Sequence, residues 1–262
     1  MRAIIEETSS TKIEVRDKLT DSPVVEIANL RKSFENNHVL KDINLRIKKG
    51  ENVVVLGKSG SGKSVLIKCI IRLIEPDEGR LEVLGSDITA LNGKELIEIR
   101  RKIGFLFQSG ALYDSMSVRE NLEFPLNRQL RSIKKEIINC QVEEALHDVG
   151  LENAIDLMPS ELSGGMRKRI GLARTLILRP ELILYDEPTT GLDPITSREI
   201  SKLILEVQKK YDATSIIITH DMECARITGN RIIVLKDGVF AQEGTYKELD
   251  KADDPWVRSF FE

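Results

Sequence analysis

The sequence lacks an apolar run long enough to cross a membrane. A transmembrane helix needs about 20 predominantly apolar residues, whereas the apolar stretch 66–74 is interrupted by Lys68 and Arg72. Residues 1–22 are polar and of mixed charge, without the apolar core of a secretory signal. We therefore expect a polar N-terminal tail over 1–22, and any role at a membrane would depend on a partner chain.

Cysteine, histidine and net charge are also scarce. The 262 residues include three cysteines and three histidines, and none of them stands in the C-x-x-C or Cys/His spacing of a zinc site. Three well-separated cysteines are typical of reduced thiols in a cytosolic protein. A net charge of −3 gives no reason to expect a nucleic-acid partner. We expect the local basic run Arg167-Lys168-Arg169 to be a solvated helix face.

Short apolar, β-branched runs alternate with segments of helical pattern along most of the chain. This alternation predicts an α/β fold with a parallel sheet. The expected strands are 52–56, 81–84, 103–107, 182–185, 215–219 and 231–236, and the expected helices are 64–74, 166–178 and 195–211.

Two segments depart from the alternation and define the expected domain organisation. Strands at 24–30 and 39–47 predict a β element before the main sheet. Between about 111 and 165 the pattern is helical, at 118–130, 133–149 and 152–157, which predicts an inserted helical subdomain. The main domain would then cover 23–244.

The expected C-terminal tail, 245–262, contains the only tryptophan, Trp256, and the pair Phe260-Phe261. Aromatic side chains at a chain end indicate docking, either on the same chain or on a partner.

Residues 57–64, with the sequence GKSGSGKS, match the phosphate-binding loop pattern G-x-x-x-x-G-K-S in full. The loop lies between a predicted strand and a predicted helix, which is the context that the pattern requires. Its glycines permit unusual backbone angles and a close approach of backbone N–H groups to phosphates. Lys63 would reach the β- and γ-phosphates, and the Ser64 hydroxyl would bind Mg²⁺. The residues expected at the nucleotide are Gly57, Ser59, Gly60, Gly62, Lys63 and Ser64.

An apolar strand that ends in two carboxylates supplies the second part of the site. Asp186 and Glu187 follow the run 182–185, and ligands bind at the carboxyl ends of parallel strands. An acidic pair after a strand can also mark the start of a helix. Beside a phosphate-binding loop, however, Asp186 is expected at Mg²⁺ and Glu187 as the general base that polarises the attacking water.

Several further residues carry little information singly. Gln108 follows one predicted strand and could contact Mg²⁺ or water, and His220 follows another and could contact the γ-phosphate. Asp193 by itself is a turn aspartate. Phe34 could stack on adenine or pack in the core.

The segment Leu162-Ser163-Gly164-Gly165-Met166 precedes a predicted helix. Ser163 is a natural N-cap, and the glycines Gly164 and Gly165 expose backbone N–H groups to an anion. Alone, such a segment is more often an ordinary capped helix. A single nucleotide needs one phosphate cradle, so a second such element indicates two chains that share two nucleotides.

In this order, the motifs resemble those of the ABC-transporter ATPase family over about 24–244. Residues 57–64 are similar to its Walker A motif, Gln108 to its Q-loop and 162–166 to its signature. Residues 182–186 with Glu187 are similar to Walker B and the catalytic glutamate. Residues 191–193 are similar to the D-loop, and His220 to the switch histidine.

The resemblance implies an ABC ATPase fold and hydrolysis of ATP with Mg²⁺. It also implies a head-to-tail dimer of two copies, in which Walker A of one chain faces the signature of the other across ATP. Gln108, Lys63, Glu187 and His220 would be catalytic. Three departures from the family pattern are Met166 in place of a common Gln, Gly191 at the start of the D-loop, and Phe34 in place of Tyr.

The segment 107–118, the signature ending in Met166 and the tail 254–260 are similar to the ATPases of Mce-associated, Mla-type lipid transporters. This resemblance implies phospholipid transport between membranes, with permease subunits and an Mce-domain protein as partners. The chain would then lie at the cytoplasmic face of the cell membrane, held there by the permease. Two alternatives stay open, namely an ABC ATPase for another substrate and a non-transport ABC ATPase that regulates cell division through a membrane partner.

Overall fold

The computed structural model describes residues 22–129 and 134–261. Apart from Ser22, the tail expected over 1–22 lies outside the described residues. A six-stranded sheet in the order β10-β9-β3-β8-β7-β6 forms the centre of the chain. Its parallel strands are β3 (Asn52–Leu56), β6 (Ile103–Leu106), β7 (Leu182–Asp186), β8 (Thr214–Thr219) and β9 (Arg231–Lys236), and β10 (Val239–Gly244) is added antiparallel. The α/β prediction is therefore confirmed.

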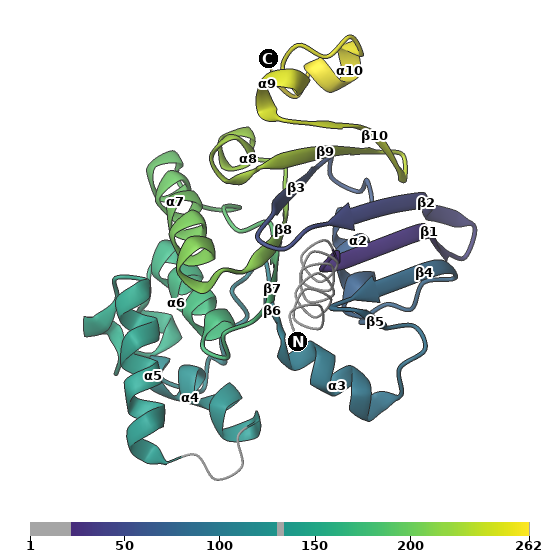
Figure 1. Ribbon diagram of the computed structural model, residues 1–262. Coiled ribbons are helices and arrows are strands. Elements are labelled where there is room, and N and C mark those ends of the chain that lie inside the picture. The colour runs from purple at the N-terminus through teal and green to yellow at the C-terminus, as the bar shows by residue number, and fades with distance from the viewer. Residues whose placement is uncertain (1–21, 130–133, 262) are drawn as a thin grey trace, which may run out of the picture.

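A second sheet, in the order β2-β1-β4-β5, is antiparallel and lies beside the first (Figure 1). It contains β1 (Val25–Phe34), β2 (Asn37–Ile47), β4 (Glu78–Val83) and the short β5 (Ser86–Asp87). The strand expected at 81–84 is thus β4 and belongs to this antiparallel sheet, not to the parallel one. The expected N-terminal β element is thus present. Its turn is shorter than expected because β1 extends to Phe34 and only Glu35 and Asn36 separate the strands. Glu35 adopts a positive φ of 51° to close this turn.

Successive side chains of the central strands point to opposite faces of the main sheet, and an apolar layer packs on each face. Val53 and Val55 of β3 face α2 (Lys63–Ile70) and the antiparallel sheet, whereas Val54 and Leu56 face the opposite layer. That layer contains α6 (Gly164–Leu176), α7 (Pro194–Tyr211) and α8 (Met222–Thr228) (Figure 1). Every β3 side chain is buried, and after Asn52 the strand is apolar, as a strand covered on both faces requires.

Between β6 and β7 the described chain is helical. It contains α4 (Val118–Gln129), α5 (Lys135–Asp148) and two single 3-10 turns at Glu152–Ala154 and Pro159–Glu161. In Figure 1, α4 and α5 extend beyond α6, away from the antiparallel sheet. The helix expected at 152–157 is wrong beyond Ala154. The carbonyl oxygen of Leu157 instead accepts a hydrogen bond from Val118 N at 2.9 Å. The helix expected at 64–74 ends at Ile70, followed by Arg72 at a positive φ of 52°.

The C-terminal segment (residues 245–261) docks on its own chain. It contains α9 (Tyr246–Leu249) and α10 (Pro255–Arg258), which lie beside β10 (Figure 1). Leu249 and Val257 are fully buried in the larger core cluster. Asp254 caps α10 by accepting a hydrogen bond from Trp256 N at 2.8 Å.

Helix α3 (Gly93–Arg101), capped at Asn92, was not expected from the sequence.

Among the described residues, no helix is long and apolar enough to span a membrane.

Candidate active site

The loop between β3 and α2 is shaped by glycines that no larger residue could replace without strain. A Cβ on Gly57 would lie 2.7 Å from the carbonyl oxygen of Leu235 in neighbouring β9. Gly62 adopts a φ of 103°, which is the left-handed region that favours glycine. Gly62 is also the N-cap of α2, and no side chain among the described residues caps it. The first N–H groups of α2 therefore remain available to an anion.

Lys63 and Ser64 connect this loop to the residues at the end of β7. Lys63 Nζ donates to the carbonyl oxygens of Gly57 at 2.8 Å and Lys58 at 3.2 Å. It lies 3.8 Å from Glu187 Oε1, and burial lowers its pKa against the opposing effect of that carboxylate. Ser64 Oγ donates to Asp186 Oδ1 at 3.0 Å. The strand-end carboxylates therefore face the loop, as expected.

Glu187 is held from several directions. Its backbone has a positive φ of 52°, an uncommon conformation for a residue with a side chain. Its backbone N–H donates to Ile218 at 2.9 Å. Its Oε2 accepts from Thr190 Oγ1 at 3.1 Å and lies 2.8 Å from His220 Nδ1. The carboxylate is thus fixed between β7 and the residue that follows β8, with only 12% of its side chain exposed.

One pocket of about 660 Å³ brings most of the expected site residues together. Phe34 lines it from the end of β1 and is 44% exposed, so it is not the core aromatic of the alternative interpretation. Asp186 reaches the same site through Ser64. The expected residues that line this P-loop pocket are Phe34, Gly57, Ser59, Gly60, Gly62, Lys63, Ser64, Gln108, Glu187 and His220.

The remaining expected residues lie elsewhere in the chain. Ser163, Gly164, Gly165 and Asp193 line a separate pocket of about 590 Å³ with Met166. Ser163 caps α6 by accepting from Met166 N at 3.2 Å. Asp193 caps α7 through bonds from Ile195 N and Thr196 N, and its hydrogen bond with the Thr196 hydroxyl lowers its pKa. A single chain therefore does not bring its second phosphate cradle to its own P-loop.

Lys168 was not expected at the site. The basic run 167–169 was interpreted as a solvated helix face, and for Lys168 this is wrong, since it is 6% exposed. Lys168 Nζ donates to the carbonyl oxygens of Gln108 and, at 3.2 Å, of Glu187. Only the packing of α6 against the ends of β6 and β7 brings these three residues together.

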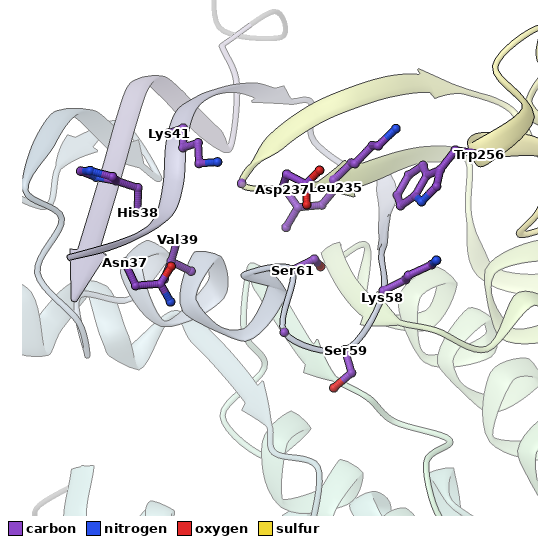
Figure 2. A pocket seen from close by; sticks show the side chains of 13 residues that line it. Asn37, His38, Val39, Lys41, Lys58, Ser59, Ser61, Leu235, Asp237 and Trp256 are labelled. Atoms are coloured by element: carbon purple, nitrogen blue, oxygen red, sulfur yellow. The ribbon is translucent and has the colours of Figure 1, made fainter. Parts of the chain in front are cut away.

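The C-terminal segment also reaches the P-loop, which the sequence did not reveal. Phe260 lines the P-loop pocket, and its ring contacts Trp256 edge-on at 4.8 Å between centroids. Lys58 Nζ of the P-loop lies 5.8 Å from the Trp256 ring centroid. A neighbouring pocket of about 550 Å³ has Trp256 and Lys58 on one side and His38 on the other (Figure 2).

We expect nucleotide binding to change the fluorescence of Trp256, the single tryptophan of the chain. Phosphates in the loop would draw Lys58 from the indole ring, and cation–π contacts depend on that distance. Titration with ATP while tryptophan emission is recorded measures this. The Lys63→Ala variant is the control and should show no change. Constant emission at an ATP concentration shown by equilibrium dialysis to saturate the site would contradict the prediction.

The described residues fit a magnesium nucleotide. Ser61 Oγ in the loop is buried and has no hydrogen-bond partner among the described residues. The Ser64 hydroxyl and the Asp186 carboxylate are the oxygen donors that Mg²⁺ prefers, and they are already in contact.

Comparison with known proteins places this chain in a family. The profile of the ABC transporter family matches residues 40–190. The chain belongs to this family, and its fold is that of an ABC ATPase. Similarity extends to a solved structure, the dimeric post-hydrolysis state of the ATP-binding cassette MJ0796 bound to ADP and Pi. That chain is 37% identical with a TM-score of 0.77, and the match covers 84% of this chain and 98% of the other.

Two curated relatives are similar over 90% of the chain. The probable ribonucleotide transport ATP-binding protein mkl of Mycobacterium leprae is 42% identical over 236 residues, which cover 68% of its own length. The intermembrane phospholipid transport system ATP-binding protein MlaF of Haemophilus influenzae is 38% identical over 237 residues, which cover 89% of its length. The chain thus spans about two thirds of the mycobacterial relative and most of MlaF.

Proposed function

We propose that the chain is the ATP-hydrolysing subunit of a membrane phospholipid transporter and that it works as a dimer of two copies. The observation that supports the dimer best is the separation of the P-loop pocket from the pocket around Ser163, Gly164 and Gly165. Two chains arranged head to tail would join one pocket of each kind at each ATP. The similar MJ0796 cassette was solved in a dimeric state, which supports the same arrangement.

Within each site, the P-loop would bind the phosphates and orient them. Its backbone N–H groups and Lys63 would contact the β- and γ-phosphates, while Phe34 would stack on adenine. Ser64, Asp186 and Gln108 would hold Mg²⁺, which when bound neutralises part of the phosphate charge.

Glu187 would orient and deprotonate the attacking water. Its Oε2 faces His220 and its Oε1 faces Lys63, so the carboxylate lies between the groups proposed to contact the γ-phosphate. Ser163, Gly164 and Gly165 of the partner, with its Asp193, would complete the site on the opposite side. The partner's α6 N-terminus would then stabilise negative charge on the γ-phosphate.

ATP-driven closure of the dimer would move a permease in the membrane, which would place the chain at the cytoplasmic face. Phospholipid is the proposed cargo because the MlaF relative carries that function in its name and matches over nearly its full length. The similarity of residues 107–118 and of Met166 to Mla-type ATPases supports the same cargo and an Mce-domain partner. A ribonucleotide is the second candidate because of the name of the mycobacterial relative.

Affinity purification from membranes tests the cargo. The chain is tagged, extracted in mild detergent, and its co-purifying subunits and bound small molecules are identified by mass spectrometry. We expect a permease, an Mce-domain protein and bound phospholipid. A permease with a ribonucleotide-binding subunit and no lipid enrichment over a mock purification would overturn the phospholipid proposal in favour of the second candidate.

A further inference from the structure

Helix α6 carries a buried cation into the active site of its own chain. The helix begins at the signature segment (residues 162–166), and Lys168 lies one turn further along. Its Nζ donates to the carbonyl oxygens of Gln108, after β6, and of Glu187, after β7. One side chain thus connects the signature helix with both the Q-loop and the expected catalytic base.

The surroundings of Lys168 differ from those of Arg169, the next residue. Arg169 forms an ion pair with Glu199 at 2.8 Å. Lys168 has no ion pair within the described part of the chain, and its Nζ donates to two backbone carbonyl oxygens. Burial lowers its pKa, while the nearby carboxylates of Glu187 and Asp186 oppose that effect. Burying a cation without a paired carboxylate is unfavourable, so packing alone does not explain the residue.

Lys168 contacts the backbone of Glu187, which has an uncommon conformation. Glu187 has a positive φ of 52°, and such conformations persist where the surroundings hold them. Its N–H donates to the carbonyl oxygen of Ile218 in β8, and its carbonyl oxygen accepts from Lys168 Nζ. The direction of the Glu187 carboxylate depends on this backbone. A substitution of Lys168 would therefore change the position of the Glu187 carboxylate through the main chain.

We propose that Lys168 is a positioning residue that fixes the backbone of Glu187 and Gln108 for hydrolysis, and that it links this geometry to the signature helix. The inference rests on the proposed ATPase roles of Glu187 and Gln108. It assigns to Lys168 an effect on the chemical step in its own chain's site, separate from the contact of the signature segment with the partner's nucleotide.

The test compares Lys168→Met, Lys168→Arg and wild type in the full chain. Met retains the length and apolar stem of lysine without the charge. We expect Lys168→Met to lower kcat about 10- to 100-fold, the scale of a misplaced catalytic group, with the Kd for ATP changed less than threefold. Lys168→Arg should recover part of the rate. Lys202→Met, on the exposed side of α7, is the control and should leave both values unchanged.

A second arm tests whether Lys168 acts through Glu187. In single-turnover measurements, Lys168→Met added to Glu187→Gln should lower the residual rate less than twofold, because the base is already lost. An unchanged kcat in Lys168→Met, or a full 10-fold further loss in the Glu187→Gln background, would overturn the inference. Absence of ATP hydrolysis by the wild-type chain would instead contradict the proposed function.

Discussion

Replacement of Glu187 by Gln is expected to lower the ATP turnover rate by about 10²–10⁴-fold, the usual contribution of a general base. The amide cannot accept the proton of water but can still occupy the position beside His220 and Thr190. ATP binding should therefore persist, and the ATP-bound dimer should accumulate because hydrolysis no longer opens it. Phosphate release and size-exclusion chromatography with ATP measure the two effects.

The matched control is Glu181→Gln, immediately before the same strand. Glu181 forms an exposed surface pair with Lys102 at 3.2 Å, so its replacement should leave turnover and oligomeric state unchanged. Normal turnover in Glu187→Gln would show that another group acts as the base.

Replacement of Ser163 by Arg is expected to lower turnover by at least about 10²-fold, the scale on which a preorganised donor to a transition state contributes. Ser163 is the N-cap of α6 and exposed at the second pocket, where the partner's nucleotide would lie. The larger side chain would keep the two chains apart. The Kd for ATP should change little because the P-loop of the same chain is intact.

Ser160→Arg adds the same charge three residues earlier, at an exposed position, and serves as the control. It should retain turnover. If Ser163→Arg hydrolysed ATP at the wild-type rate, the shared site between two chains would be wrong.

The strands and the P-loop were predictable because their determinants are local. The apolar run of β3 and the glycines after it require no tertiary information, and the structure places β3 at the expected residues 52–56. The carboxylates after β7 were predictable as well, because parallel strands present their ends to one edge of the sheet. These local signals were enough to predict the phosphate-binding loop and the two carboxylates that face it.

Lys168 and Phe260 could not be predicted in the same way. A lysine in a basic run resembles a solvated residue until α6 is packed against the ends of β6 and β7. Phe260 reaches the P-loop pocket only because Val257 anchors α10 in the core and Trp256 packs beside Lys58. Both positions result from tertiary packing that no sequence period encodes.

Met166 acquires a physical interpretation from the structure. Its side chain is half-buried and packs against the larger core cluster, while its backbone N–H is bound by Ser163. An apolar residue therefore stabilises the start of α6 at a position where a polar residue is common in the family. The helix N-terminus, and with it Gly164 and Gly165, remains available to the partner's nucleotide.

Cross-linking across the shared site tests the central claim most directly. Two Glu187→Gln preparations are used, one with Ser59→Cys in the P-loop and one with Ser163→Cys, both with the exposed Cys140 replaced by Ser. After mixing and mild oxidation, we predict a disulfide-linked dimer of the two different chains that forms with ATP and Mg²⁺ and is strongly reduced without them. No ATP-dependent cross-link between the two chains, while each still binds ATP, would contradict an active site formed from the P-loop of one chain and the signature segment of its partner.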